Sequence, residues 1–359
     1  MRLKSGALIC NDKFMKSAFG RKYLPYIFGR QSKGRDPVTV HVGVLRRRIP
    51  IKNQNHYLPR NSIAIESYFT LHHTFNEKYP YCKKIKLVCS AFNSNPKSFR
   101  KKARYIKLCE SDMVDRCWGK ARREEVKKKY DILIITEFSN KGMQCKGLQT
   151  LGLIEDIAKE FDLRVAVVDT GCKKKRRYAM NNKSHGLFVK EINRMVKKDN
   201  SINLFRSGGS SPPMNQRQLN RLMQSSKILL CGSTNDASPK IITEAIIRGL
   251  PILLNKNILG GQKYINEENG ILYDGAVTSR DLYENYDYFK ENLFSAIERS
   301  LSTTYNVKDI MGNYYKYWGL KSTSKRLARY LNKTFGFNLK YAFYPQFRRF
   351  FKKKKSGSF

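Results

Sequence analysis

The chain has 359 residues, enough for two ordinary domains, and its 41% hydrophobic and 12% aromatic content excludes a mainly disordered protein. It carries 70 Lys and Arg against 29 Asp and Glu, a formal net charge of +41. This surplus indicates either a solubility role or an anionic partner, such as nucleic acid, an acidic membrane surface or a phosphate-bearing substrate. No run reaches the roughly 18 apolar residues of a spanning helix, and we expect no secretory signal.

The eight cysteines and five histidines show no metal-binding spacing. No two cysteines form a CxxC pair, and the histidines lack the H-x₃₋₅-H spacing of zinc sites. We therefore expect reduced, mostly buried thiols in a cytoplasmic protein, with neither a structural zinc ion nor a disulfide framework.

The first part of the chain gives a pattern of short strands. Residues 1–36 are basic and contain several glycines, which predicts a partly disordered segment. Apolar runs, most clearly the alternating one at Val38–Leu45, predict strands in a short α/β domain over residues 37–128: Val38–Leu45, Ile63–Phe69 and Ile85–Phe92. The highly charged stretch 97–129 predicts helix and linker.

Residues 129–300 alternate between apolar strands and helices. Buried strands are predicted at Asp131–Thr136, Leu163–Val168, Ile202–Phe205, Lys227–Cys231 and Pro251–Asn255. Helices are predicted at Leu148–Phe161, Gly186–Lys197, Asn215–Ser225, Pro239–Arg248 and 281–300. This alternation predicts an α/β domain with a doubly wound parallel sheet. Residues 301–340 predict C-terminal helices, with one over 307–333, and 341–359 form a polybasic, aromatic tail.

The densest chemical signal lies between Lys227 and Asp274. A buried strand ends at Cys231, and a loop of small and polar residues follows, with one acid, Asp236. The next helix places Glu244 in its second turn, and its first turn offers unpaired N–H groups to an anion. Gly260 and Gly261 follow the next strand, where backbone can approach a ligand closely. Both loops are expected at the carboxyl ends of strands, where open α/β sheets bind ligands.

This segment resembles retaining GT-B glycosyltransferases of the family 4 type. The spacing of Asp236 and Glu244 is similar to the family's E-x₇-E motif, and S-P, E-A, G-L-P, G-G and N-G-apolar-apolar occur in the family's order. D-A-S-P and N-I-L-G-G resemble members from algae and their large DNA viruses. The resemblance covers residues 130–300. It implies a GT-B-like α/β fold, with two Rossmann-like domains facing a cleft and the N-terminal one reduced.

The resemblance implies roles for individual residues. Of the candidate catalytic pair, Glu244 would hold the ribose hydroxyls of a nucleotide and Asp236 would contact the donor sugar. Lys146 and Gly147 resemble the K-G after the first strand of the donor domain, where the lysine neutralises a diphosphate. Lys146 as an ordinary solvated loop charge is the alternative. Further donor-binding residues would be Ser238, Pro239, Lys240, Gly260 and Gly261.

The sequence departs from the family pattern at two positions, one in side-chain length and one in charge. The first acid is Asp rather than Glu, one methylene shorter, and the arginine that usually precedes the lysine is missing. Glu137 or Lys141 lies near that position, and Lys141 is the candidate second cation. In the N-terminal half, His41, His72 and His73 could meet the sugar, although a lone histidine is more often structural.

The implied function is transfer of a hexosyl or pentosyl group from a nucleotide-diphosphate sugar, with retention. The acceptor would be a glycan, a lipid-linked molecule or a glycoprotein. The chain has no D-x-D pair, the usual holder of a metal on a diphosphate, so we expect no metal and no cofactor besides the co-substrate. One alternative is an inactive scaffold that keeps the fold. The other is a nucleic-acid-binding protein, although no recognition motif supports specific binding.

Two basic runs leave alternatives open. Lys173–Arg177 is interpreted as a solvated loop, with attraction of a nucleotide sugar or nuclear localisation as alternatives. The tail Phe343–Lys355 interleaves aromatic and basic residues, which suits peripheral contact with an anionic membrane on its cytosolic face. A disordered tail is the alternative.

Overall fold

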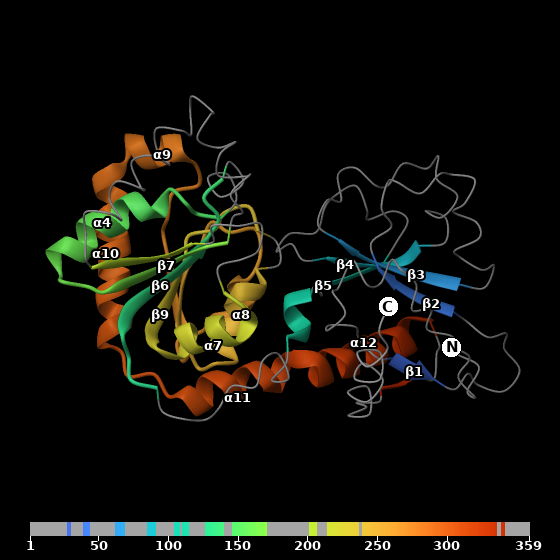
Figure 1. The fold of residues 1–359 in the computed structure, drawn as a ribbon. Helices are drawn as coiled ribbons and strands as arrows, with labels where there is room; N and C mark the ends of the chain where they lie inside the picture. Colours follow the sequence, from blue (N-terminus) through green and yellow to red (C-terminus); the bar gives the residue numbers. More distant parts are fainter. Residues whose placement is uncertain are drawn as a thin grey trace, which may run out of the picture. The chain divides into compact units, whose positions relative to one another are not determined.

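The computed structural model divides into two compact units (Figure 1). The first comprises Met1–Ser90, Asn95–Met113 and Tyr317–Phe359, and the second Ala91–Ser94 and Val114–Lys316. The residues described are 27–29, 39–43, 62–68, 85–90, 104–107, 110–114, 126–139, 146–170, 201–206, 214–236, 239–335 and 339–341. The segment 301–340, grouped by sequence as C-terminal helices, is divided between the units at Tyr317.

The first unit contains a four-stranded parallel sheet in the order β2-β3-β4-β5. Its strands are β2 (Thr39–Gly43), β3 (Ser62–Tyr68), β4 (Ile85–Ser90) and β5 (Arg104–Lys107). The first three agree with the predicted strands. The prediction of helix and linker over 97–129 was wrong at β5, because parallel backbone pairing with β4 makes this charged segment a strand.

The C-terminal part of the chain completes the first unit. Helix α12 (Gly319–Phe335) packs against a 3-10 helix, Glu110–Met113, and Thr323 Oγ1 donates to the Asp112 carbonyl at 2.6 Å. Strand β12 (Leu339–Tyr341) pairs antiparallel with β1 (Ile27–Gly29). Segments about three hundred residues apart thus share one small sheet.

The second unit is built on a six-stranded sheet in the order β11-β10-β9-β6-β7-β8, and every pairing is parallel. The strands are β6 (Tyr130–Thr136), β7 (Val165–Asp169), β8 (Ile202–Arg206), β9 (Ser226–Cys231), β10 (Ile252–Asn255) and β11 (Gly270–Tyr273). Five of them were predicted from their apolar runs. The prediction missed β11, a four-residue edge strand that pairs with β10.

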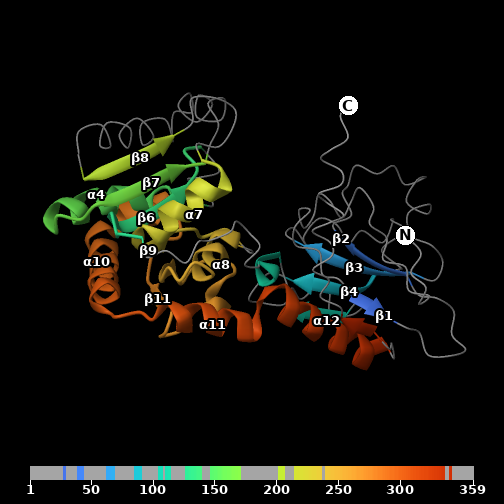
Figure 2. The same cartoon turned by 60° about the horizontal axis from the view of Figure 1, so that its bottom comes forward.

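Helices cover both faces of this sheet (Figures 1 and 2). On one face lie α4 (Thr150–Glu160) and α10 (Tyr286–Ser302), joined by a 2.6 Å hydrogen bond from Tyr286 Oη to Asp156 Oδ2. On the other lie α7 (Gln216–Gln224) and α8 (Lys240–Ile246). The helix predicted over 281–300 is divided between α9 (Ser279–Glu284) and α10, and the one over 307–333 between α11 (Val307–Tyr317) and α12. The predicted helix 186–197 lies outside the described residues.

The core of the second unit lies where helices press on the central strands. Strand β7 is buried along its whole length, and Ile132, Leu133 and Leu253 have no exposed surface. Strands buried on both faces need continuous apolar runs, which is why the sequence revealed them. The architecture confirms the predicted α/β class. Within the described residues, no helix is long and apolar enough to cross a membrane.

Asp131 fastens the amino-terminal end of β6 to the strands on either side. Its carboxylate accepts from Arg164 N at 2.9 Å, from Arg164 Nε at 3.2 Å and from Lys227 Nζ at 2.8 Å. Arg164 precedes β7, and Lys227 belongs to β9. Burial acts to raise the pKa of Asp131, but the hydrogen bonds from Lys227 and Arg164 outweigh it and hold the pKa below 3.8.

We predict that Asp131→Asn lowers the free energy of unfolding by about 1–3 kcal/mol at pH 7, because it removes the charge from these hydrogen bonds. A lowered folded-state pKa stabilises the protein above the ordinary value of 3.8. That stabilisation is lost as the pH falls below 3.8. The difference in free energy of unfolding between Asp131→Asn and the wild type should therefore become smaller at low pH. Urea unfolding at pH 7 and near pH 3 measures this. An unchanged gap would contradict the assignment.

Candidate functional site

The candidate site lies at the carboxyl end of the six-stranded sheet, between β6 and β9. These strands are neighbours, yet the chain leaves β6 towards α4 on one face and β9 towards α8 on the other. Loops diverge at such a switch in strand order, and open α/β sheets bind ligands there. The described candidate residues outside α8, which are Lys146, Gly147, Asp236, Pro239, Gly260 and Gly261, fall between β6 and α4, between β9 and α8, and after β10.

The structure brings Lys146 and Asp236 together across this switch point. Lys146 Nζ forms an ion pair with Asp236 Oδ2, although the two residues are 90 positions apart. The lysine side chain is 31% exposed and the aspartate side chain 13%. The Lys146 carbonyl accepts a hydrogen bond from Thr136 Oγ1 at 3.0 Å, which ties the lysine backbone to the end of β6. A cation and a carboxylate thus meet where the sequence predicted a donor site.

Two glycines allow the loops after β6 and β9 to cross in close contact. Gly147 has a φ of +68°, and a Cβ placed there would lie 2.2 Å from the carbonyl carbon of Gly232. A Cβ at Gly232 would in turn lie 2.2 Å from Thr150 Oγ1. Gly147 was predicted as a site residue, whereas Gly232 was not. A glycine directly after a buried strand was the available signal.

The loop after β10 is tied to the loop after β9. Gly260 N donates to the Asp236 carbonyl at 3.1 Å, and Leu259 N donates to the Thr234 carbonyl at 3.0 Å. Gly261 has a φ of +107°, and a Cβ there would lie 2.8 Å from Pro239 Cγ. The structure therefore gathers Asp236, Pro239, Gly260 and Gly261 around the same edge.

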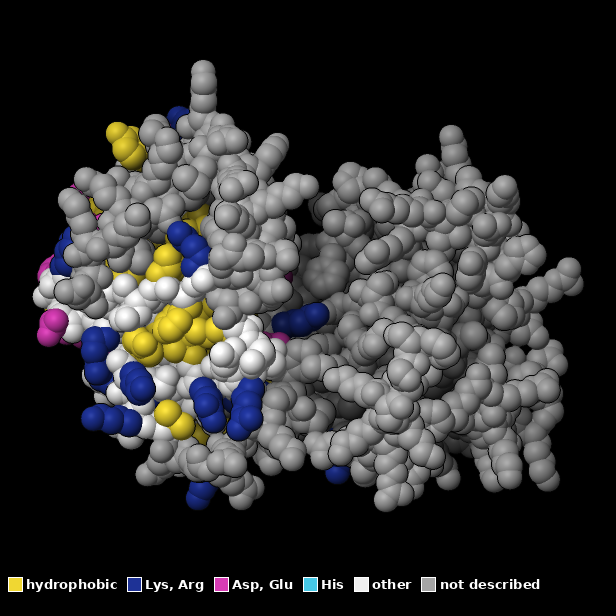
Figure 3. Space-filling model, viewed as in Figure 1, with side chains coloured by type: hydrophobic (Ala, Val, Ile, Leu, Met, Phe, Trp, Pro, Cys, Tyr) yellow, Lys and Arg dark blue, Asp and Glu magenta, His cyan; other side chains and the backbone are white. Residues whose placement is uncertain are grey.

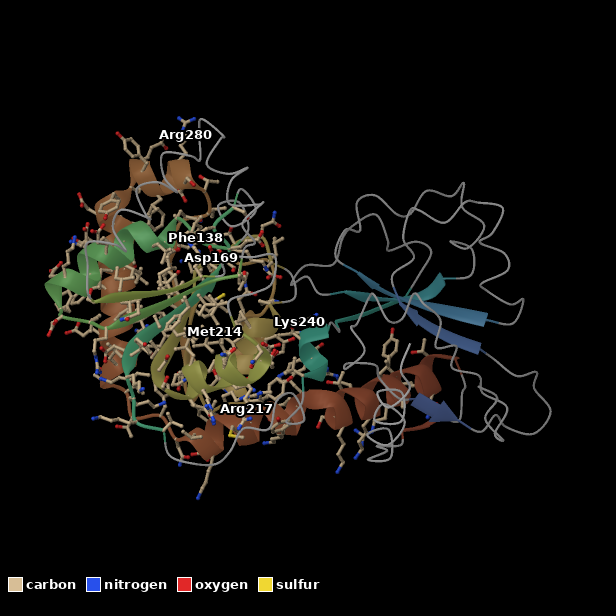
Figure 4. All side chains as sticks on the ribbon, viewed as in Figure 1. Phe138, Asp169, Met214, Arg217, Lys240 and Arg280 are labelled. Carbon is tan, nitrogen blue, oxygen red and sulfur yellow. The ribbon has the colours of Figure 1, made fainter. Side chains whose placement is uncertain are left out.

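Glu244 lies in α8, and the whole residue is only 7% exposed. Helix α8 begins at Lys240 and has seven residues, shorter than the predicted Pro239–Arg248. Figure 4 labels Lys240 at its start. Burying a carboxylate is costly without polar partners, and Glu244 takes part in an interaction within the protein. The prediction that it holds a ribose depends on the small part of the residue that remains accessible.

Several sequence predictions fall outside the described residues. Ser238 and Lys141 are among them, as are the run 173–177 and the tail 343–355. The same holds for His72 and His73, whereas His41 belongs to β2 in the first unit. Their roles stay predictions.

Sequence reasoning missed a polar cluster beside the site. Asp169, at the end of β7, has no exposed surface, accepts from Phe138 N at 3.0 Å and pairs with Arg206 Nε at 3.1 Å. The Arg206 guanidinium lies over the Phe138 ring, 4.7 Å from its centroid. Figure 4 labels Phe138 and Asp169 side by side. Asp169 thereby holds Phe138, the second residue after β6, in place. An acid at the end of an otherwise apolar strand was the signal.

The last residues of β9 and β11, Cys231 and Tyr273, are buried beneath the loops. Burial raises the pKa of the Cys231 thiol, although hydrogen bonds from Ser233 act in the opposite direction. Burial likewise raises the pKa of Tyr273, which is 4% exposed. Both groups stay neutral near pH 7 and serve as packing. Within the described residues, no group of three His, Cys, Asp or Glu could hold a metal ion.

One face of the second unit carries more basic than acidic side chains. Figure 3 shows Lys and Arg side chains spread over this visible face, with fewer Asp and Glu side chains. The net charge of +41 of the whole chain favours the approach of anionic ligands, without selecting among them.

The fold is similar to solved glycosyltransferase structures. The pneumococcal O-GlcNAc transferase GtfA, solved with UDP and GlcNAc, matches with a TM-score of 0.53 at 13% identity, over 82% of this chain and 56% of that one. A TarM variant from S. aureus, solved with fondaparinux, alpha-GlcNAc-glycerol and UDP, matches with a TM-score of 0.51 at 11% identity, over 82% and 55%. Sucrose-phosphate synthase from Thermosynechococcus elongatus matches with a TM-score of 0.50 at 11% identity, over 85% and 75%. No protein-family model and no curated protein matches the sequence.

These likenesses establish the GT-B glycosyltransferase fold and confirm the predicted fold class. At 11–13% identity they show the architecture alone. The chain spans about half the length of the first two structures, 56% and 55%.

We predict opposite effects of alanine at two glycines only five positions apart. Gly147→Ala should lower the free energy of unfolding by at least about 2 kcal/mol, because it strains a positive φ and presses on Gly232. Gly152→Ala, inside α4 with nothing within 4 Å of the new Cβ, should raise it by about 0.5–1 kcal/mol. Urea unfolding of both variants measures this. Equal stabilities would show that the loops do not meet at Gly147.

Proposed function

We propose that this chain is a glycosyltransferase of the GT-B family 4 type. It would transfer a hexosyl or pentosyl group from a nucleotide-diphosphate sugar to a glycan, lipid-linked or glycoprotein acceptor, with retention and without a metal. The observation that carries this proposal is the meeting of Lys146 and Asp236 at the switch point of a GT-B fold. The titles of two structural neighbours support a nucleotide donor, since GtfA and TarM were both solved with UDP.

The proposed roles follow from charge and position. The Lys146 ammonium would stabilise the charge that develops on the departing nucleoside diphosphate as the glycosidic bond breaks. A fixed cation of this kind does for the leaving group what a metal ion does elsewhere. Asp236 would accept hydrogen bonds from the sugar, and Glu244 from the ribose.

The backbone would complete the donor site. The backbone at Gly260 and Gly261 would approach the donor, and Gly261 packs against Pro239 with no space for a side chain. Backbone groups at Ser238 and Lys240 and the side chain of Lys141 would add contacts to sugar or phosphate. We predict that each of these groups binds or orients the donor.

A ligand panel tests whether the chain binds a donor. We expect one of UDP-, GDP- and ADP-sugars to raise the melting temperature, since a ligand at a hundred times its Kd stabilises the folded state by about 2.7 kcal/mol. The panel uses the full chain, with uridine and free glucose as controls for the nucleoside and sugar alone. Failure of every nucleotide to shift the transition would contradict the proposal.

Glu244→Ala tests the assignment of the ribose contact. We expect it to weaken binding of the active nucleotide sugar by about tenfold to a hundredfold, the value of hydrogen bonds to a charged group. The matched control is Glu291→Ala, an exposed glutamate on α10, which should bind as wild type does. Calorimetric titration measures both, and melting temperatures without ligand check folding. Undiminished binding by folded Glu244→Ala would remove Glu244 from the site.

A further inference from the structure

Lys146 is already engaged by a carboxylate of its own chain before any ligand arrives. The Lys146–Asp236 ion pair joins the residue proposed for the diphosphate to the residue proposed for the sugar. A donor that places its diphosphate on Lys146 must compete with this carboxylate for the ammonium group. We propose that Asp236 is a specificity determinant that disfavours the free nucleoside diphosphate and favours the nucleotide sugar. This inference rests on the proposed function.

The backbones of both residues are held, so the exchange falls to the side chains. The Lys146 carbonyl is bound by Thr136 Oγ1 at 3.0 Å, and the next carbonyl, of Gly147, accepts from Thr150 N at 3.1 Å at the start of α4. The Asp236 carbonyl accepts from Gly260 N at 3.1 Å. Because these anchors fix both loops, Asp236 stays next to Lys146 when the diphosphate binds.

Burial makes the exchange unfavourable for an anion alone. The Asp236 side chain is 13% exposed, so water can replace little of what Lys146 provides. A diphosphate on Lys146 also brings negative charge beside the carboxylate, which repels it. A free nucleoside diphosphate is the worse case, because its terminal phosphate has one more ionisable oxygen than the esterified phosphate of a nucleotide sugar.

The sugar of a bound donor can replace the hydrogen bond that Asp236 loses when Lys146 turns to the diphosphate. Its hydroxyl groups can donate hydrogen bonds to Asp236, and hydrogen bonds to a charged acceptor are the strong kind. The nucleotide sugar therefore offers hydrogen bonds to both members of the pair, whereas the nucleoside diphosphate offers them through its diphosphate to Lys146 alone. After transfer the sugar is gone, and Asp236 competes with the product for Lys146, which favours product release.

The test compares matched ligand pairs on the full chain by calorimetric titration: UDP with UDP-glucose, GDP with GDP-mannose, and ADP with ADP-glucose. For the pair that binds, Asp236→Asn should tighten the nucleoside diphosphate by about twofold to fivefold, the range of a partly exposed ion pair. The same variant should weaken the nucleotide sugar. Asp236→Glu keeps the charge and should retain the wild-type preference.

The matched control is Asp274→Asn. Asp274 pairs with Lys256 at 2.8 Å at the same edge of the sheet, and the substitution removes the same charge. It should change neither affinity, which separates a local effect from the general charge of the protein. Asp236→Ser is a second neutral variant if Asn disturbs the loop.

The outcomes distinguish this inference from the function on which it rests. If wild type binds a pair and the neutral Asp236 variants bind the nucleoside diphosphate no more tightly, the inference is overturned and the donor site stands. If Asp274→Asn tightens binding of the nucleoside diphosphate equally, the change in affinity reflects the general charge of the protein, and the inference is again overturned. If wild type binds none of the three pairs, both the function and the inference are overturned.

Discussion

The pairing of β6 with β9 is the constraint on which the candidate site depends. Two strands separated by about ninety residues lie side by side and in parallel, so the loops that follow them open at one edge of the sheet. The helices after them pack on opposite faces of the sheet (Figure 1), so the two chain segments part after their contact at Gly147 and Gly232. Asp131 supports this pairing from the opposite end by holding β6 to Arg164, which precedes β7, and to Lys227 of β9.

Small residues and hydrogen bonds then determine how close the loops come. Gly147 and Gly232 bring the two chains into contact, and the hydrogen bond from Gly260 to Asp236 adds a third loop. Asp169 performs a similar task from the neighbouring strand through Phe138. The charged groups therefore occupy fixed backbone positions, which is a condition for electrostatic stabilisation without reorganisation.

Sequence reasoning recovered the parts of this structure that depend on local pattern. Apolar runs revealed β6, β7, β9 and β10, because both faces of these strands are buried. It missed β5, whose charged residues become a strand only by pairing with β4. The family motif placed Lys146 and Asp236 near one edge, but their ion pair depends on side-chain positions across 90 residues. The Asp169 cluster depends on three strands at once, which no linear spacing reveals.

The antiparallel contact between β1 and β12 has a consequence for synthesis of the chain on the ribosome. The second unit is complete once Lys316 has emerged, whereas the first waits for α12 and its last strand. Domains generally fold as they leave the ribosome, so the order of folding here is reversed relative to the order of translation. Strand β1 therefore stays without its partner until Leu339–Tyr341 has been synthesised, long after the four strands β2–β5 that pair with one another.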